Sequence, residues 1–476
     1  MNLNDIPALP AAIPESVATA FRRQFSCRDD YLGLEERRRA LDHLETLVRE
    51  NIPAFCAAIQ SDFGVRSTHE TRLLEIFPSL EAIRHARRHI KRWMKPQPRA
   101  TGIWFLPGRS RIVFQPLGVV GVVVPWNYPL YLAIGPVVSA LAAGNRILVK
   151  MSEAAPATGE LFARLVAGHF DPSLLAVVNG DADIGRAFVS LPFDHLLFTG
   201  STPVGKNVMR AAAEHLTPVT LELGGKSPAI VGRDFPVDEA AGRILYGKCL
   251  NAGQTCIAPD YVLVPAERID DFVRAASATV ASLYPALRDN PDYTAIVNAR
   301  HRERLQHCLD DATAKGASAI ELNPAREDLA ASPKMAPRLL TGVTSDMRVM
   351  QEEIFGPLLP LVPYTTLDEA IAFVNQRPRP LALYVFDHDR GNVDRVIAQT
   401  TSGGVTVNET ILHIAQEDLP FGGVGPSGMG EYHGRAGFET FSKRKAVFFQ
   451  SRLNGLKLFR PPYGRRFEAI ARFLFR

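Results

Sequence analysis

The chain has 476 residues, more than the roughly 250–300 at which single hydrophobic cores stop growing, so at least two domains are expected. Its 46% apolar and 22% charged residues are typical of a globular protein rather than a disordered one. The net charge is only +4, and residues 451–476 carry seven basic residues against one Glu, so the remainder is slightly acidic and a nucleic-acid partner is not expected.

Five cysteines occur at irregular spacing, without a Cys-x-x-Cys pair: Cys27, Cys56, Cys249, Cys256 and Cys308. The odd number argues against a disulfide framework, and the spacing argues against a zinc site. Free thiols fit a reducing compartment. The first residues also lack the basic and long apolar regions of a secretory signal, so we expect a cytoplasmic protein without a bound metal.

The first predicted elements are helices. Residues 15–95 carry apolar side chains at helical spacing among charged ones, most clearly after Leu34 and after Glu70. Residues 117–144 then run for 28 positions without a charge, long enough to cross a bilayer. Prolines and Asn127 interrupt this run, and its start is rich in valine, so we predict a buried strand, a polar loop and a buried helix.

Short apolar runs then alternate with helical patterns, which is typical of βαβ units and a parallel sheet. The predicted strands lie at 118–124, 146–150, 175–178, 195–199 and 219–223, with helices starting near Pro129, Ala157, Ala182 and Val204. A second region of this kind follows Gly225. Its predicted strands lie near 229–231, 261–264, 359–364, 382–386 and 404–408.

Outside these two regions the sequence predicts a hairpin and a tail. Pro107 and Gly108 separate two β-like runs, 103–106 and 111–115, and a late run at 445–450 could pair with them. Residues 467–474 have apolar side chains at helical spacing among arginines. Such a basic amphipathic helix can lie on an anionic membrane or pack on a dimer, and we favour packing because the segment is short.

Residues 251–256 (Asn-Ala-Gly-Gln-Thr-Cys) place one thiol after a turn of small residues. An isolated cysteine is most often a small buried apolar residue, and this is what we expect of Cys249. Around Cys256, however, Gly253 and its small neighbours let the backbone come close to a substrate. Cys256 is therefore the candidate nucleophile.

A nucleophilic cysteine also needs an oxyanion donor and a base that activates water. Glu222 lies inside the apolar run 219–223, where burial raises the pKa of a carboxylate toward the range useful for a general base, although an isolated Glu is usually a solvated surface residue. Asn127 lies between two prolines in a loop after a strand. Its amide is a candidate donor, although Asn and Pro also favour turns.

These segments, residues 125–129 (Pro-Trp-Asn-Tyr-Pro), 222–226 (Glu-Leu-Gly-Gly-Lys) and 251–256, resemble the aldehyde dehydrogenase superfamily, and the resemblance runs from about residue 20 to the C-terminus. It implies that Cys256 attacks an aldehyde. It also implies that the Asn127 amide and the Cys256 N–H hold the oxyanion, and that Glu222 activates the water that hydrolyses a thioester. The implied product is a carboxylic acid.

The resemblance also implies NAD as the cofactor, with NADP as an alternative. Residues 200–205 (Gly-Ser-Thr-Pro-Val-Gly) follow a strand and open a helix, which suits a pyrophosphate. This pattern alone is weak, but it matches a family motif in which Gly200, Ser201 and Gly205 contact the cofactor.

The remaining cofactor residues are implied in the same way. Lys150 is expected on the adenosine ribose, with Glu153 beside its 2′ position. Within residues 352–357 (Glu-Glu-Ile-Phe-Gly-Pro), Glu353 is expected on the nicotinamide ribose and Phe355 against the nicotinamide. An acidic pair before an apolar strand would otherwise be read as a solvated loop.

The implied fold is α/β, with two Rossmann-like domains and a β-hairpin oligomerisation arm. The dinucleotide-binding domain is expected at residues 1–100 and 117–224, and the catalytic domain at 225–420. Oligomerisation strands are expected at 101–116 and 440–450, followed by the basic tail at 451–476.

The short chain and the tail resemble the class 3 aldehyde dehydrogenases, which are dimers, so a homodimer is implied. Residues 149–153, 251–260 and 450–455 look most like bacterial coniferyl aldehyde dehydrogenases. This implies an aromatic substrate such as coniferyl aldehyde, with Tyr128 as a candidate pocket residue. The alternatives are a fatty-aldehyde dehydrogenase of the same class, a CoA-acylating enzyme, or a dinucleotide-binding protein without chemistry.

Overall fold

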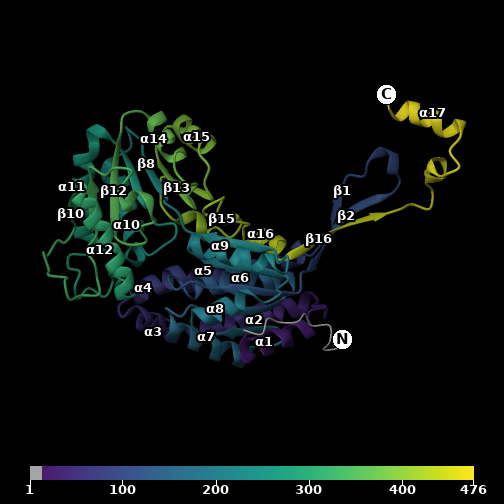
Figure 1. Ribbon diagram of the computed structural model, residues 1–476, viewed down its shortest axis with the longest axis horizontal. Helices are drawn as coiled ribbons and strands as arrows, with labels where there is room; N and C mark the ends of the chain where they lie inside the picture. The colour runs from purple at the N-terminus through teal and green to yellow at the C-terminus, as the bar shows by residue number, and fades with distance from the viewer. Residues whose placement is uncertain (1–12, 476) are drawn as a thin grey trace.

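The computed structural model describes residues 13–475. Two largely parallel sheets with covering helices form the body, and a third, antiparallel sheet projects from it as an arm (Figure 1). The predicted α/β fold is confirmed.

Helices occupy most of the first hundred residues, as the apolar spacing predicts. They are α1 (Glu15–Ser26), α2 (Leu34–Glu50), α3 (Ile52–Phe63), α4 (Thr68–Thr71) and α5 (Phe77–Trp93), with a π-helical turn (Arg72–Ile76) before α5. The long helices bury one face each. In α2, for example, Leu41, Leu44 and Leu47 are fully buried while the arginines of the other face reach solvent.

The first sheet has the strand order β15, β7, β6, β3, β4, β5. Its members are β3 (Val119–Val123), β4 (Arg146–Lys150), β5 (Leu175–Val178), β6 (His195–Gly200), β7 (Val219–Leu223) and the antiparallel β15 (Gly428–Met429). Helices α6 (Tyr131–Ala143), α7 (Pro156–His169), α8 (Ala182–Val189) and α9 (Thr202–Ala213) connect them. The chain order reverses between β3 and β6, and ligands bind at this kind of switch point in doubly wound sheets.

The charge-free segment 117–144 is a strand, a loop and a buried helix, as predicted. All thirteen residues of α6 are buried. Gly144 ends the helix with a φ of 91°, and its N–H donates to the carbonyl of Ala140 at 3.1 Å. Within residues 13–475, no helix combines the length and apolar character needed to cross a membrane.

The second sheet has the order β10, β11, β12, β9, β8, β13, β14. Its strands are β8 (Pro228–Val231), β9 (Tyr261–Pro265), β10 (Ser318–Glu321), β11 (Arg338–Thr341), β12 (Leu358–Tyr364), β13 (Ala382–Phe386) and β14 (Gly404–Val407). Helices α10 (Val237–Cys249), α11 (Ile269–Leu283), α12 (Ala299–Ala314), α13 (Arg348–Gln351), α14 (Leu367–Asn375) and α15 (Arg390–Gln399) accompany them. The sequence did not predict β10 and β11, because both are short and β10 is a largely exposed edge strand without an apolar run.

The arm consists of β1 (Gln97–Arg99), β2 (Arg109–Pro116) and β16 (Ser442–Phe449). The predicted late strand is confirmed, since β16 pairs with β2 along its whole length. The predicted strand at 103–106 is wrong. Residues Ile103–Phe105 form a 3₁₀ turn, and β2 pairs instead with β1. The apolar run was misread because β propensity describes side chains on a half-buried sheet surface, whereas Ile103 is 74% exposed.

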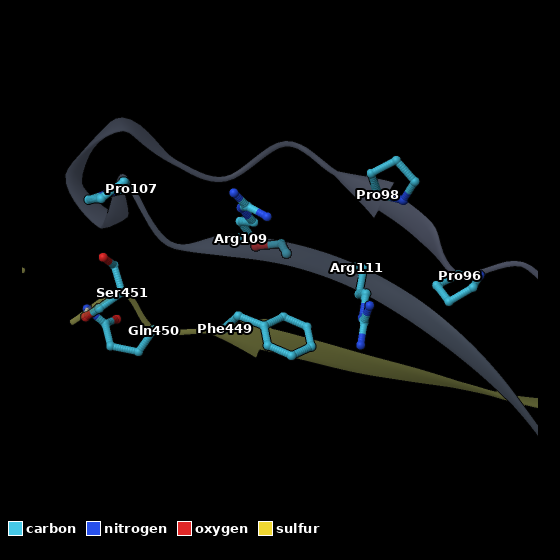
Figure 2. A pocket seen from close by; sticks show the side chains of 9 residues that line it. Pro96, Pro98, Pro107, Arg109, Arg111, Phe449, Gln450 and Ser451 are labelled. Atoms are coloured by element: carbon cyan, nitrogen blue, oxygen red, sulfur yellow. Dashed lines mark hydrogen bonds between the residues drawn. The ribbon is translucent and has the colours of Figure 1, made fainter. Parts of the chain in front are cut away.

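A groove runs along this arm between β2 and the end of β16 (Figure 2). The Arg111 guanidinium lies over the Phe449 ring, 4.3 Å from its centroid. Beyond β16 the chain continues to α17 (Arg465–Leu474), which lies near the arm and away from the body (Figure 1). Phe473 of α17 meets Trp104 edge to face, with the ring centroids 6.1 Å apart. The preceding α16 (Gly434–Thr440) packs on α6 and α5 in the body.

Candidate active site

A cavity of about 620 Å³ lies at the carboxyl ends of β3, β6 and β7, beside the switch point. Its size is in the range of small-molecule sites. Seven of the eleven predicted site residues line it: Asn127, Gly200, Ser201, Glu222, Cys256, Glu353 and Phe355. The fold therefore gathers groups that are far apart in the sequence.

The loop that carries Cys256 has an unusual backbone. After α10 the chain takes left-handed φ values of 52°, 51° and 75° at Asn251, Ala252 and Gly253. Side chains are strained in this region by about 1–2 kcal/mol per residue. At Gly253 a Cβ would also lie 2.4 Å from the carbonyl of Gly356, so glycine is needed there for space as well as for φ.

Gln254 holds this loop in place from inside. Its amide nitrogen donates to the carbonyls of Asn251 at 2.9 Å and Ala295 at 3.0 Å, and its amide oxygen accepts from the N–H of Val297 at 3.0 Å. The side chain is fully buried. The strained turn is thereby fixed, and it presents the partly exposed Cys256 to the cavity.

The electrostatic environment of Cys256 favours the neutral thiol. Burial, followed by the carboxylates of Glu353 and Glu222, raises its pKa to about 12, while the N–H groups of Cys256 and Ile257 oppose this rise. Those donors are the kind that stabilise negative charge on the sulfur. Cys249 differs from Cys256 because it is fully buried at the end of α10.

Glu222 lies in β7, between β6 and β15. It is 3% exposed, and neither carboxylate oxygen finds a hydrogen-bond partner among residues 13–475. Burial, and then repulsion from Glu431, raise its pKa well above the usual value. A desolvated carboxylate of this kind, facing a cavity that also holds a thiol, is suited to proton abstraction near neutral pH.

Asn127 lies in the loop between β3 and α6 and is 3% exposed. Its side-chain nitrogen donates to the carbonyl of Gln254 at 3.2 Å, two residues before Cys256. The main-chain carbonyl of Asn127 accepts from Asn251 Nδ2 at 3.1 Å. Asn127 is thus bonded to the loop that carries Cys256, and it lines the same cavity.

The predicted pyrophosphate segment occupies the start of α9. Gly200 and Ser201 line the cavity, whereas Gly205 does not. A Cβ at Gly205 would lie 2.6 Å from the Leu223 side chain, so this glycine lets α9 approach β7. The helix N-terminus directed at the cavity fits an anionic group.

Lys150 and Glu153 lie outside the cavity lining, at and beyond the carboxyl end of β4. The Lys150 ammonium is buried and donates to the carbonyls of Met151 at 2.7 Å and Gly180 at 2.8 Å. Burial lowers its pKa, and the exposed Glu153 opposes this effect most strongly. The two side chains therefore interact with each other electrostatically.

Glu353 and Phe355 approach from the other sheet. The Glu353 carboxylate lies against Gly224, where a Cβ would be 1.9 Å from it. Burial, and then Asp260, raise the pKa of Glu353 to about 8. Phe355 has a φ of 49°, a strained value for a bulky residue. Its ring meets Trp126 edge to face at 5.4 Å.

Tyr128 is not among the residues that line this cavity. It is 8% exposed, and its hydroxyl pairs with the Thr255 hydroxyl at 2.7 Å. The structure thus places it in contact with the loop that carries Cys256.

Other lining residues had not been predicted. They include His301 and Arg304 from α12, together with Trp126. Trp126 could have been found from its place beside Asn127, whereas the charged surface pattern of α12 carries no comparable signal.

A sequence model of the aldehyde dehydrogenase family matches residues 10–447. The chain belongs to this family. It is 55% identical to a Pseudomonas aeruginosa protein named probable coniferyl aldehyde dehydrogenase over 440 residues, 92% of each chain. It is 49% identical to the coniferyl aldehyde dehydrogenase of a Pseudomonas species, over 92% of this chain and 91% of that one. Mammalian members of aldehyde dehydrogenase family 3 also match, at 40% to 42% identity, which confirms the class 3 resemblance.

A solved structure of Staphylococcus aureus AldH in a substrate-bound state superposes with a TM-score of 0.90. It shares 38% identity and covers 96% of this chain and 99% of its own. The protein is therefore an oxidoreductase that oxidises aldehydes, and enzymes of this family use NAD or NADP. The cavity fits such a cofactor. The N-terminus of α9 lies at one part of its lining, and the carboxylates of Glu222 and Glu353, which have buried oxygens without a hydrogen-bond partner in the described chain, lie at another.

Proposed function

We propose that this aldehyde dehydrogenase converts an aromatic aldehyde such as coniferyl aldehyde to its carboxylic acid through a thioester on Cys256. The observation that carries the chemistry is the convergence of Cys256, Glu222 and Asn127 on one cavity. The aromatic substrate is supported by 55% and 49% identity to the two Pseudomonas proteins.

In the first half-reaction Cys256, a neutral thiol at rest, gives up its proton to solvent. The resulting thiolate attacks the carbonyl carbon, and the carbonyl oxygen becomes the oxyanion of a thiohemiacetal. The Asn127 amide and the Cys256 N–H donate hydrogen bonds to this oxygen. A preorganised donor of this kind stabilises a transition state by about 3–4 kcal/mol. Glu353 and Phe355 would hold the nicotinamide end of a bound NAD or NADP, which would supply the hydride acceptor for the same carbon. Loss of that hydride leaves Cys256 as a thioester.

In the second half-reaction Glu222 takes a proton from a water molecule that adds to the thioester carbonyl. The tetrahedral adduct collapses, the carbon–sulfur bond breaks, and the carboxylic acid leaves. Cys256 is regenerated as a thiolate. Glu222 is suited to this step because burial disfavours its charged form, so it accepts a proton readily.

The residues proposed to hold the cofactor are Lys150, Glu153, Gly200, Ser201, Gly205, Glu353 and Phe355. We propose NAD as the preferred form. The support is Glu153, whose exposed carboxylate lies near Lys150 after β4. A carboxylate at the ribose 2′ position accepts a hydrogen bond from a hydroxyl and repels a phosphate.

A kinetic panel tests substrate and cofactor together. Coniferyl aldehyde, benzaldehyde and short and long aliphatic aldehydes are each assayed with NAD and with NADP. We expect the highest kcat/KM for coniferyl aldehyde with NAD. If a long aliphatic aldehyde gives the highest kcat/KM, the fatty-aldehyde alternative is favoured. A requirement for CoA would favour acyl transfer to CoA. A preference for NADP would show that Glu153 does not face the 2′ position.

We further propose a cytoplasmic homodimer in which the tail packs on the partner. All five cysteines, each in the described part, are free thiols. In the single chain Phe473 and Phe475 of the tail are 68% and 86% exposed, as is much of the arm tip around Trp104. Apolar surface of this kind marks an interaction site.

Deletion of residues 464–476 is therefore expected to lower the melting temperature, by about 1–3 °C for each kcal/mol of packing lost in a chain of this size. Binding to anionic vesicles should not change. Differential scanning calorimetry and vesicle sedimentation measure the two effects. If the full-length protein pellets with vesicles and the deletion variant does not, the tail binds membrane instead.

A further inference from the structure

A buried ion pair lies behind the loop that carries Asn127. Arg66 is 1% exposed and Glu75 is fully buried, and Arg66 Nη2 lies 3.2 Å from Glu75 Oε1. Both precede α5, far from the loop in sequence. Burial of two charges is costly unless further hydrogen bonds compensate, so the other contacts of the pair indicate its role.

Both members of the pair hold the main chain of the Asn127 loop. Arg66 Nη1 donates to the Asn127 carbonyl at 2.6 Å. Glu75 Oε2 accepts from the N–H of Leu130 at 2.8 Å and, more weakly, from that of Tyr131 at 3.3 Å. The loop is thereby fixed at Asn127 and at the start of α6.

The local backbone also sets the direction of Glu75. This residue lies in the π-helical turn Arg72–Ile76, between α4 and α5. Turns of this type are rare, insert an extra residue into a helix, and occur frequently at functional sites. The extra residue re-aims the side chains of the turn, which lets Glu75 face the loop.

Arg66 contacts the next residue of the loop as well. Its guanidinium lies 4.8 Å from the centroids of both the Phe63 and the Tyr128 rings. Tyr128 in turn bonds to Thr255, which precedes Cys256. A planar guanidinium can donate a hydrogen bond, pair with a carboxylate and stack on rings at the same time, which a lysine ammonium cannot do.

We propose that Arg66 is a positioning residue that holds the Asn127 side-chain amide where the oxyanion forms, with Glu75 as its counter-ion. This inference rests on the oxyanion role proposed for Asn127. Within the described chain Arg66 is not part of the cavity lining. Its effect on the reaction therefore passes through the loop.

The first test is Arg66→Met, which retains a long apolar stem. A misplacement of about 1 Å can slow a reaction by about 100-fold, so we expect kcat and the NADH burst rate to fall together by about 10- to 100-fold. The KM for aldehyde and the affinity for NAD should stay within about twofold. Arg66→Lys should give a smaller loss, because it keeps the charge opposite Glu75.

Arg84→Met is a matched control. It removes a partly exposed guanidinium of α5 that pairs with Glu45 of α2 and with Glu81 of α5, and we expect wild-type kinetics. If Arg66→Met does not fold, the comparison of Arg66→Lys with wild type and Arg84→Met serves instead. A wild-type burst rate in the folded Arg66 variant overturns the proposal.

A double-mutant cycle separates positioning from general damage. In an Asn127→Ala background, Arg66→Met should lower the burst rate by less than about threefold further, because residues that act through one another are not additive. A full additional loss would show that Arg66 does not act through Asn127. If Asn127→Ala alone has a wild-type burst rate, Asn127 does not stabilise the oxyanion, and the role inferred for Arg66 is contradicted as well.

Discussion

Cys256→Ala is expected to abolish aldehyde oxidation and to leave NAD binding intact. Without the thiol no carbon–sulfur bond forms, and the loss of a nucleophile lowers kcat by several orders of magnitude, here at least about 10⁴-fold. The loop should keep its shape, since it is held by the buried Gln254 side chain and not by the sulfur. NADH formation measures the first effect, and cofactor fluorescence measures the second.

Cys249→Ala provides the matched control. This cysteine is seven positions earlier and fully buried at the end of α10. Its replacement should leave turnover close to wild type and lower the free energy of unfolding by about 1 kcal/mol, a common cost of a small core truncation. Turnover of Cys256→Ala above ~1% of wild type would contradict the nucleophile role, because nucleophile losses are far larger.

Glu222→Gln is expected to give one rapid burst of NADH, after which turnover stalls at the thioester. Glutamine has the same shape but cannot accept the proton of water, and the hydride has already left when water is needed. General-base catalysis contributes about 10²- to 10⁴-fold, so the steady-state rate should fall by that factor. Stopped-flow absorbance separates the burst from the steady state.

The pH dependence of the steady state tests the same residue. Burial and Glu431 raise the pKa of Glu222, so its carboxylate form, the active base, accumulates as pH rises through that raised value. The deacylation rate of the wild type should therefore increase with pH, and Glu222→Gln should lose this increase.

Glu431→Gln offers a graded control. Loss of the neighbouring negative charge lowers the pKa of Glu222. The increase of the deacylation rate with pH should therefore occur at lower pH, while the NADH burst is unchanged. If the burst and the steady state of Glu222→Gln fall together, Glu222 also takes the proton of Cys256.

The parallel strands of the body were predictable because strands buried on both faces read as continuous apolar runs. Prediction failed where that signal is missing. The edge strand β10 is mostly exposed. Residues 103–106 are apolar, yet the first three of them form a 3₁₀ turn in the loop between β1 and β2. Strand β2 pairs with β1 on one side and on the other with β16, which lies more than 300 residues away in the sequence.

By itself the sequence determined the family and predicted the residues proposed for the chemistry, because the candidate nucleophile, base and oxyanion donor lie in local motifs around Cys256, Glu222 and Asn127. Only the tertiary structure decided how these groups are held. The Arg66–Glu75 pair and the α12 side chains come from remote segments, and Gln254 is anchored on the remote carbonyl of Ala295. Burial and the distances between atoms are properties of the packed chain, so contacts of this kind leave no local pattern to read.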